Sequence, residues 1–281
     1  MIHQTSGFSA RERFAALASF SDRDIDIAEA ALLIAAEEQP GLDPRPWLRR
    51  LDLLARELRH RLEGVENDLE RLYRLTGFLF DELGLRGNDQ DYYDPRNSLL
   101  NEVLDRRLGI PLTLGILCIE VGRRVGISLD GIGFPGHFLV RHSLHPHLVL
   151  DPYDGGRLLT VRDFEEILER VSGGRLTFEP RMLRPIGPRQ ILVRMLNNLR
   201  GIYLNQGDFS RALSVVDRVL LLIPEDPEVL RDHGFLSLQW GDPTRGIEDL
   251  ERYLEAEPEA EDQEEVLAVL AEARRRQSMP H

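Results

Sequence analysis

The sequence predicts an α+β core followed by an all-helical repeat domain. Apolar residues recur at helical spacing through much of the first half of the chain, and two strands are predicted only later, over Gly131–Arg141 and His147–Asp151. Beyond Pro188 the sequence repeats itself with a period of 34 residues. Because helices precede antiparallel strands, we expect a core over residues 1–188 and a repeat domain over residues 189–281, not a wound α/β sheet.

The charge and composition of the 281 residues exclude several classes of protein. A formal net charge of −13 argues against a nucleic-acid partner, since phosphate binding needs clustered cations. No window approaches the roughly 18 apolar residues of a membrane span, and Met1–Ala10 lacks the basic and apolar stretches of an export signal. The single cysteine, Cys118, cannot form an internal disulfide. We therefore expect a cytoplasmic protein without nucleic acid or membrane partners.

The predicted elements of the core follow in order along the chain. Helices with apolar periodicity occupy residues 10–84, and Pro40, Pro44 and Pro46 separate the first of them. Residues 84–95 form a loop that is too polar to pack as core. A short helix capped by Asn97 or Ser98 then runs to Arg107, and Gly109 ends it.

A second helix of the core begins at Pro111, whose fixed φ and missing N–H suit a first helical position. It runs to Gly126, and the two predicted strands follow it. The second strand ends in a Pro-Tyr-Asp-Gly-Gly turn, and another short helix is predicted over residues 161–171. A helix start is thus followed in the sequence by two strand segments.

The repeat domain is predicted from four matches at one offset. Gly207-Asp208 recurs as Gly241-Asp242, Ala212 as Gly246, Leu220 as Leu254 and Pro224 as Pro258, each 34 residues later. That is the tetratricopeptide period, in which a small residue lets two helices approach and a proline follows the second helix. We expect about two such repeats over residues 197–261, with Trp240 in the core of the second; two unrelated helical hairpins are the alternative.

His137 and Asp151 are the candidate catalytic pair. A nucleophilic site needs a nucleophile, a base within hydrogen-bond reach, and a group that orients the base. On neighbouring strands, Asp151 could accept a hydrogen bond from the His137 imidazole, and the helix that starts at Pro111 would supply a positive dipole end. The alternative is a structural histidine held by an aspartate that only closes a turn.

Several segments together resemble the SirB-type family of bacterial transglutaminase-like proteins, which typically carry C-terminal tetratricopeptide repeats. The resemblance spans residues 43–258 and implies a papain/transglutaminase-like core, with His137 and Asp151 at the family's histidine and aspartate positions. The segments that carry it are Asn101–Leu104, Arg106-Arg107, Gly109–Leu114, Phe134–Arg141 and Asp151-Pro152.

The nucleophile is missing from the position that the resemblance implies. In catalytic transglutaminase-like domains a cysteine opens the helix before the histidine, and here that position holds Pro111. Cys118 lies two turns further on, about 10 Å along the axis, among apolar residues that would raise its pKa. Thr113 is better placed, but a threonine in a first helical turn is more often structural. Asn101, Glu102, Arg106, Pro111 and Arg141 are candidates for the rim of a groove, although Glu102 and Arg106 equally suit a solvated helix face.

The sequence supports three hypotheses of function. The first is a non-catalytic protein that binds a protein or peptide partner through its core groove and its repeats. The second is a hydrolase or acyltransferase in which His137 and Asp151 serve an atypical nucleophile. The third is a metal site built from His137, His142, His145 and His147, for which surface histidines at a hairpin tip are the alternative. We expect neither a metal nor a cofactor.

Overall fold

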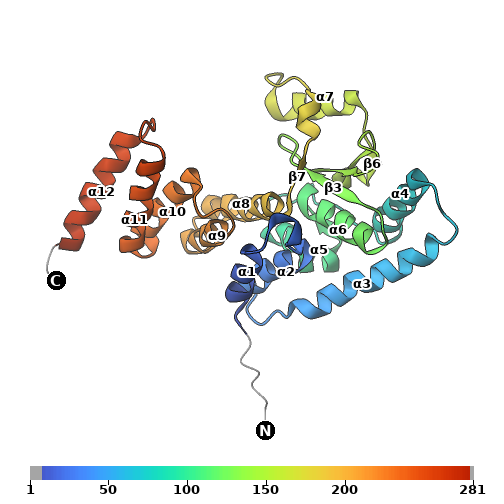
Figure 1. Cartoon of the computed structure of the whole chain (residues 1–281), viewed down its shortest axis with the longest axis horizontal. Coiled ribbons are helices and arrows are strands. Elements are labelled where there is room, and N and C mark those ends of the chain that lie inside the picture. Colours follow the sequence, from blue (N-terminus) through green and yellow to red (C-terminus); the bar gives the residue numbers. More distant parts are fainter. Residues whose placement is uncertain (1–7, 279–281) are drawn as a thin grey trace, which may run out of the picture. The chain divides into compact units, whose positions relative to one another are not determined.

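The chain divides into two compact units, which the computed structural model describes over residues 8–278 (Figure 1). Unit 1 comprises Met1–Met195 and unit 2 comprises Leu196–His281. The division falls inside helix α8 (Pro188–Gln206). Most of Met1–Ala10, to which the expectation about an export signal applies, lies outside the described residues. Within the described range, no helix is both long and apolar enough to cross a membrane.

Unit 1 is mainly helical, and α6 lies at its centre. Every side chain of α6 from Pro111 to Gly122 is buried, which is typical of a helix that is covered on all sides. Most helices of the unit precede α6 in the chain, and short 3₁₀ turns lie between several of the elements. The helices of this unit are α1 (Ala10–Ala18), α2 (Ile27–Glu38), α3 (Pro44–Arg61), α4 (Asp68–Thr76), the π-helix η2 (Gly77–Glu82), α5 (Leu100–Arg106), α6 (Pro111–Arg124) and α7 (Val161–Ser172). The 3₁₀ turns are η1 (Asp22–Asp24), η3 (Pro95–Ser98), η4 (Pro152–Asp154) and η5 (Pro180–Leu183).

A five-stranded antiparallel sheet with the order β6-β5-β4-β3-β7 completes the core. The predicted strand Gly131–Arg141 is wrong, because it folds as a hairpin in which Ile132 pairs with Leu139. Pro135-Gly136 makes the turn, and a Pro-Gly pair is a turn signal. The strands are β3 (Leu129–Ile132), β4 (Leu139–His142), β5 (Val149–Asp151), β6 (Arg157–Leu158) and β7 (Pro185–Ile186).

Glycine lets α6 approach this sheet. A Cβ at Gly115 would lie 2.5 Å from the ring of Phe138, which is itself buried just before β4. Helix and sheet are therefore in contact at a point where no larger residue fits. On the sheet, Phe134 and Leu139 pack with Phe164 and Leu168 of α7 in one apolar cluster. The α+β prediction is confirmed.

The polar loop before α5 is more ordered and more buried than predicted. Arg86–Gly87 forms β1, which pairs in parallel with β2 (Leu108–Gly109). Asn88 and Asp94 are buried, which corrects the expectation that this loop is too polar for the core. Their burial is tolerated because Asn88 donates to Asn97 Oδ1 at 3.1 Å and Asp94 pairs with Arg106 at 3.1 Å. The predicted cap is also displaced, since residues 95–98 form η3 and α5 begins at Leu100.

Unit 2 is a stack of antiparallel helices with the predicted repeat. Ala212 is buried, and a Cβ at Gly246 would lie 2.9 Å from the carbonyl oxygen of Gly234, so small residues do permit close helix approach. Trp240 is not in the core, contrary to prediction: it is 46% exposed and stacks on Phe209, with ring centroids 4.0 Å apart. After α8, the helices are α9 (Phe209–Leu222), α10 (Pro227–Trp240), α11 (Pro243–Ala256) and α12 (Gln263–Ser278).

Candidate functional site

His137 lies at the end of the β3–β4 turn, two residues before β4, and not within a strand as predicted. Pro135 and Gly136 occupy the middle of this turn, Gly136 has φ +63°, and the His137 N–H donates to Phe134 O at 3.0 Å. Proline followed by a glycine with positive φ is the signature of a type II turn. Arg194 donates to the His137 carbonyl at 2.8 Å. The Phe-Pro-Gly-His segment thus fixes the histidine backbone.

Asp151 holds the imidazole from the next strand. It is the last residue of β5, which pairs with β4 as predicted, and its Oδ1 also accepts from the Tyr153 N–H at 2.9 Å. His137 Nε2 lies 2.9 Å from both Asp151 carboxylate oxygens. An ionised carboxylate only accepts, so Nε2 carries the proton and Nδ1 of the neutral ring is the acceptor. Among residues 8–278, no hydrogen bond occupies Nδ1. The predicted pair is therefore formed.

A charged cavity of about 330 Å³ opens beside the pair. Its carboxylates are largely engaged: Arg157 binds Asp154 at 2.7 Å and Asp163 at 2.6 Å. Hydrogen bonds from Thr160 and Arg157 hold the pKa of Asp163 well below its ordinary value. The cavity is lined by His137, Asp151, Tyr153, Asp154, Arg157, Asp163, Glu166, Ile167 and Arg170. No serine, threonine or cysteine is among them.

The ring of Tyr153 forms part of the wall of this cavity. This ring meets the His137 ring edge to face, with centroids 6.2 Å apart, and it meets Tyr92 at 6.2 Å. On its other side the ring lies so close to Gly87 that any Cβ there would overlap it. η4, which carries Tyr153, packs against both α6 and β1. The Tyr153 ring thus contacts both His137 and Gly87 of β1.

None of the three residues considered for the nucleophile position presents an available nucleophile. Pro111 is the first residue of α6. Thr113 is fully buried, its hydroxyl donates to Asn97 O at 2.8 Å, and it accepts from the Ile110 N–H at 3.2 Å. Cys118 is fully buried, and burial raises the pKa of its thiol. The predictions that Cys118 is core packing and that Thr113 is structural agree with these positions.

The predicted rim residues do not line the cavity beside His137. Gln39 joins two of them, since it accepts from Asn101 Nδ2 at 2.7 Å and donates to Glu102 at 2.8 Å. Arg106 reaches buried Asp94, and Arg141 reaches Asp130 at 3.3 Å. Their side chains thus hold the helices and strands of unit 1 together. Pro111 is buried at the start of α6.

The four histidines do not assemble a metal site. Among residues 8–278, no group of three histidine, cysteine, aspartate or glutamate side chains could hold a metal ion. His142 is buried in β4, which corrects its assignment as a surface histidine, and burial lowers its pKa. Its ring lies 4.9 Å from that of His145, which pairs with Asp68 at 2.8 Å. These contacts are structural ones at a hairpin tip.

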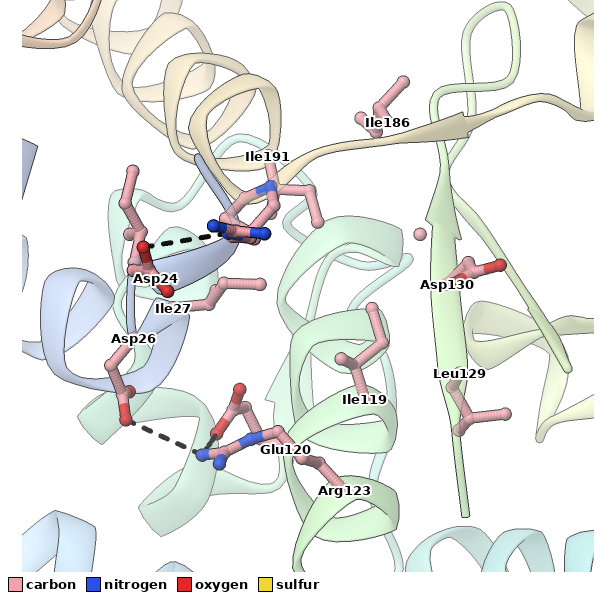
Figure 2. A pocket seen from close by; sticks show the side chains of 14 residues that line it. Asp24, Asp26, Ile27, Ile119, Glu120, Arg123, Leu129, Asp130, Ile186 and Ile191 are labelled. Carbon is pink, nitrogen blue, oxygen red and sulfur yellow. Dashed lines mark hydrogen bonds and ion pairs between the residues drawn. The ribbon is translucent and has the colours of Figure 1, made fainter. Parts of the chain in front are cut away.

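A separate cavity of about 340 Å³ lies between residues 23–27, α6, β3 and the start of α8 (Figure 2). Ile27 and Ile119 point into it, and Arg123 bridges Asp26 at 3.6 Å and Glu120 at 2.9 Å. The guanidinium of Arg123 is therefore paired within the wall. Neither His137 nor Asp151 lines it.

Sequence reasoning missed the residues that surround the pair. Tyr153 lies in the turn after Asp151 and Arg157 directly follows that turn, but only the folded chain brings them to the histidine. The signal for Tyr153 was its position two residues after the aspartate in Asp-Pro-Tyr. Gly87 gave no signal, because its partner ring is 66 residues away in the sequence.

Comparison with known proteins covers both units. The profile of the transglutaminase-like superfamily matches residues 45–197, and a tetratricopeptide repeat profile matches residues 199–271. A UPF0162 protein of Xylella fastidiosa (strain Temecula1) is 41% identical over 86% of this chain and 88% of its own length. A UPF0162 protein of Pseudomonas aeruginosa is 39% identical over 70% of this chain and 72% of its own length.

A more distant relative comes from an animal. F-box only protein 21 of Mus musculus is 27% identical over 59% of this chain, which spans 27% of that protein. The likeness therefore concerns only part of each protein. Together, the bacterial relatives and the profile matches show that the chain belongs to the transglutaminase-like superfamily, as a SirB-type UPF0162 protein with C-terminal tetratricopeptide repeats.

Proposed function

We propose that this protein is a non-catalytic member of its family that acts by binding another protein. The observation that carries the proposal is that α6 opens with Pro111, whereas His137 and Asp151 form a complete pair. Transglutaminase-like catalysis needs a thiolate within about 3 Å of its base. The single thiol is buried two turns inside the helix.

The repeat unit supplies the binding surface in this proposal. Tetratricopeptide repeats generally mediate interactions between proteins, because stacked helix pairs build an extended concave face. A core that keeps its fold without its nucleophile can serve as a scaffold in a protein that binds through its repeats. The partner expected from the sequence is thus a protein or peptide.

The test compares the chain with His137→Ala and Asp151→Asn variants. We expect no incorporation of a fluorescent primary amine into a glutamine peptide, no hydrolysis of an activated ester above background, and no difference among the three proteins. Iodoacetamide should label Cys118 only after unfolding. Turnover that His137→Ala abolishes, or fast labelling of the folded protein, would overturn the non-catalytic assignment.

Partner binding is tested by photochemical crosslinking in a bacterial lysate. The chain contains no lysine, so amine-reactive reagents would find only its α-amino group, and a photoreactive amino acid at an exposed position is required. We expect one protein to be enriched reproducibly, and equally by the chain and by His137→Ala. Failure to enrich any specific protein would count against the binding role.

One observation favours a second candidate, a hydrolase that uses water or a substrate hydroxyl. His137 Nε2 is held by Asp151 and Nδ1 is available as a base. This candidate predicts turnover that survives Cys118→Ala and disappears in His137→Ala. The activity assays above distinguish the two.

A further inference from the structure

This inference deepens the proposed function and rests on it: it names the surface and the chemistry of the partner. A cavity of about 720 Å³ lies between α10 and α12 of unit 2. Apolar side chains form much of its wall, with Phe235 and Leu238 from α10 and Ala268 and Val269 from α12. Grooves of this kind accept the apolar face of a peptide or helix.

A second cavity, of about 800 Å³, lies where α10 begins and α11 ends, and it is strongly acidic. Six carboxylates and one arginine line it: Asp226, Glu228, Arg231, Asp232, Glu257, Glu261 and Asp262. Arg231 is already bound by Asp262. Glu228, Glu257 and Glu261 have no ion-pair partner among residues 8–278. These three carboxylates are available to a cation from outside.

The α10 residues that line the two cavities lie along one face of the helix. Arg231 lines the acidic cavity and Phe235, four residues later, lines the apolar one, with the guanidinium 5.7 Å from the centroid of the phenylalanine ring. Residues four apart are neighbours on a helix surface. The face that α10 presents is thus acidic at its N-terminal end and apolar at its C-terminal end. We call it the α10 face.

The charge of unit 2 argues for a basic partner. Residues 196–281 hold 18 acidic and 9 basic side chains, so they carry −9 of the net −13. Complementary charge accelerates association and selects partners, and like charge opposes it. A second copy of the chain would bring the same excess of negative charge, and a nucleic acid would bring more. A basic segment of a different protein fits both the charge and the apolar wall.

We infer that the α10 face binds a segment of another protein in which arginine or lysine side chains adjoin a run of apolar residues. The basic side chains pair with Glu228, Glu257 and Glu261, and the apolar side chains enter the cavity between α10 and α12. Because these carboxylates are not committed to ion pairs within residues 8–278, binding breaks no pair described there.

The experiment measures anisotropy of a short fluorescein-labelled peptide with an arginine-rich half and a leucine-rich half, titrated with the full chain. Two variants address the two ends of the face. The first is a triple variant that removes the three unpaired carboxylates, Glu228→Gln/Glu257→Gln/Glu261→Gln. The second, Ala268→Gln, places a larger polar side chain at an exposed position of the apolar wall. The matched control, Glu165→Gln/Glu248→Gln/Glu255→Gln, removes the same charge from exposed positions outside both cavities.

We expect the chain to bind the peptide, the triple variant to weaken it about tenfold at low salt, and Ala268→Gln to weaken it several-fold. The control triple should bind within about twofold of the unchanged chain, and salt should reduce the effect of the charge variant. Circular dichroism establishes that each variant keeps its helices.

The inference would be overturned if the peptide did not bind or if the two triple variants weakened binding equally. It would also be overturned if a control peptide with glutamate in place of each arginine bound to the chain. Concentration-dependent self-association that Ala268→Gln removes would assign the face to a second copy and would overturn it too. The proposed function fails separately, through turnover or through the absence of a captured partner. A captured partner whose crosslinking is insensitive to the α10-face variants would refute this inference and leave the binding role standing.

Discussion

Each unit pairs a histidine with aspartate, and the two arrangements differ in what remains available on the imidazole. In unit 1, His137 meets one carboxylate, borders a cavity, and keeps Nδ1 unoccupied within residues 8–278. In unit 2, His233 of α10 is 1% exposed, with Nδ1 2.5 Å from Asp249 and Nε2 3.1 Å from Asp217. One ring can still take part in chemistry or binding, whereas the other is fully used as a crosslink between helices.

The difference teaches that a histidine–aspartate pair is not by itself a functional signal. The hydroxyl of Ser237, one helical turn away, lies 3.3 Å from Nε2 of His233. This cluster in unit 2 therefore contains the residue types of a catalytic triad. Both His233 and Ser237 are buried, however, and nothing can reach them. His137 differs in that it borders a cavity and has a ring nitrogen without a hydrogen bond among residues 8–278.

The largest effect is expected from His233→Ala. Removal of the ring leaves the carboxylates of Asp217 and buried Asp249 without their shared partner, which should cost about 3 kcal/mol of unfolding free energy. Each unit contains one tryptophan, Trp47 in α3 and Trp240 in α10, so urea unfolding in a Trp47→Phe background reports unit 2 alone. A loss below about 1 kcal/mol would show that the crosslink is not important for stability.

The next largest effect is expected where a glycine permits close packing of two elements within each unit. Gly115→Ala should force the Phe138 ring away from α6, and Gly246→Ala should force α11 away from the backbone of α10, each at about 1–3 kcal/mol. Tryptophan fluorescence in Trp240→Phe and Trp47→Phe backgrounds separates the two units.

Gly201→Ala is the control for these substitutions, because nothing lies within 4 Å of its Cβ position in α8. We expect no loss of stability there, and a gain of up to about 1 kcal/mol from helix propensity. If Gly246→Ala behaves like Gly201→Ala, the small-residue interpretation of the repeat is refuted.

A third prediction concerns pH. Burial lowers the pKa of His233, but the hydrogen bonds that its ring N–H groups donate to Asp217 and Asp249 outweigh burial, so the pKa is raised above its ordinary 6.5. A raised pKa in the folded state stabilises unit 2 fully below the unfolded value, and that stabilisation is lost as pH rises through the folded value. Urea midpoints measured upward from pH 6 should fall for the chain and change less for His233→Gln. Equal slopes would contradict a charged His233.

The smallest effect is expected from His137→Ala. His137 borders a cavity, and Asp151 keeps the Tyr153 N–H as a donor after the ring is removed, so the loss should be about 1 kcal/mol or less. Urea unfolding in a Trp240→Phe background measures it. A loss as large as that of His233→Ala would make the His137 pair a structural crosslink as well.

The fold was predictable where local rules and global packing agree. The repeat of unit 2 follows from Ala212, Gly246 and two prolines at one offset, because each position serves the same contact in each repeat. The helix start at Pro111 follows from the stereochemistry of one residue. The β3–β4 hairpin was missed although Pro135-Gly136 signalled it, because the flanking apolar residues were interpreted as one strand.

The sequence by itself determined the α+β core, the tetratricopeptide period, the family resemblance and the pairing of His137 with Asp151, since these depend on residue identity and short spacing. Only the tertiary structure decided that Tyr153 fills the space beside Gly87, that Asn88 and Asp94 are buried, that Trp240 is exposed, and that Glu228, Glu257 and Glu261 share one acidic cavity. The physical reason is that burial and electrostatic environment depend on neighbours distant in the chain, which packing brings together and which local spacing does not encode.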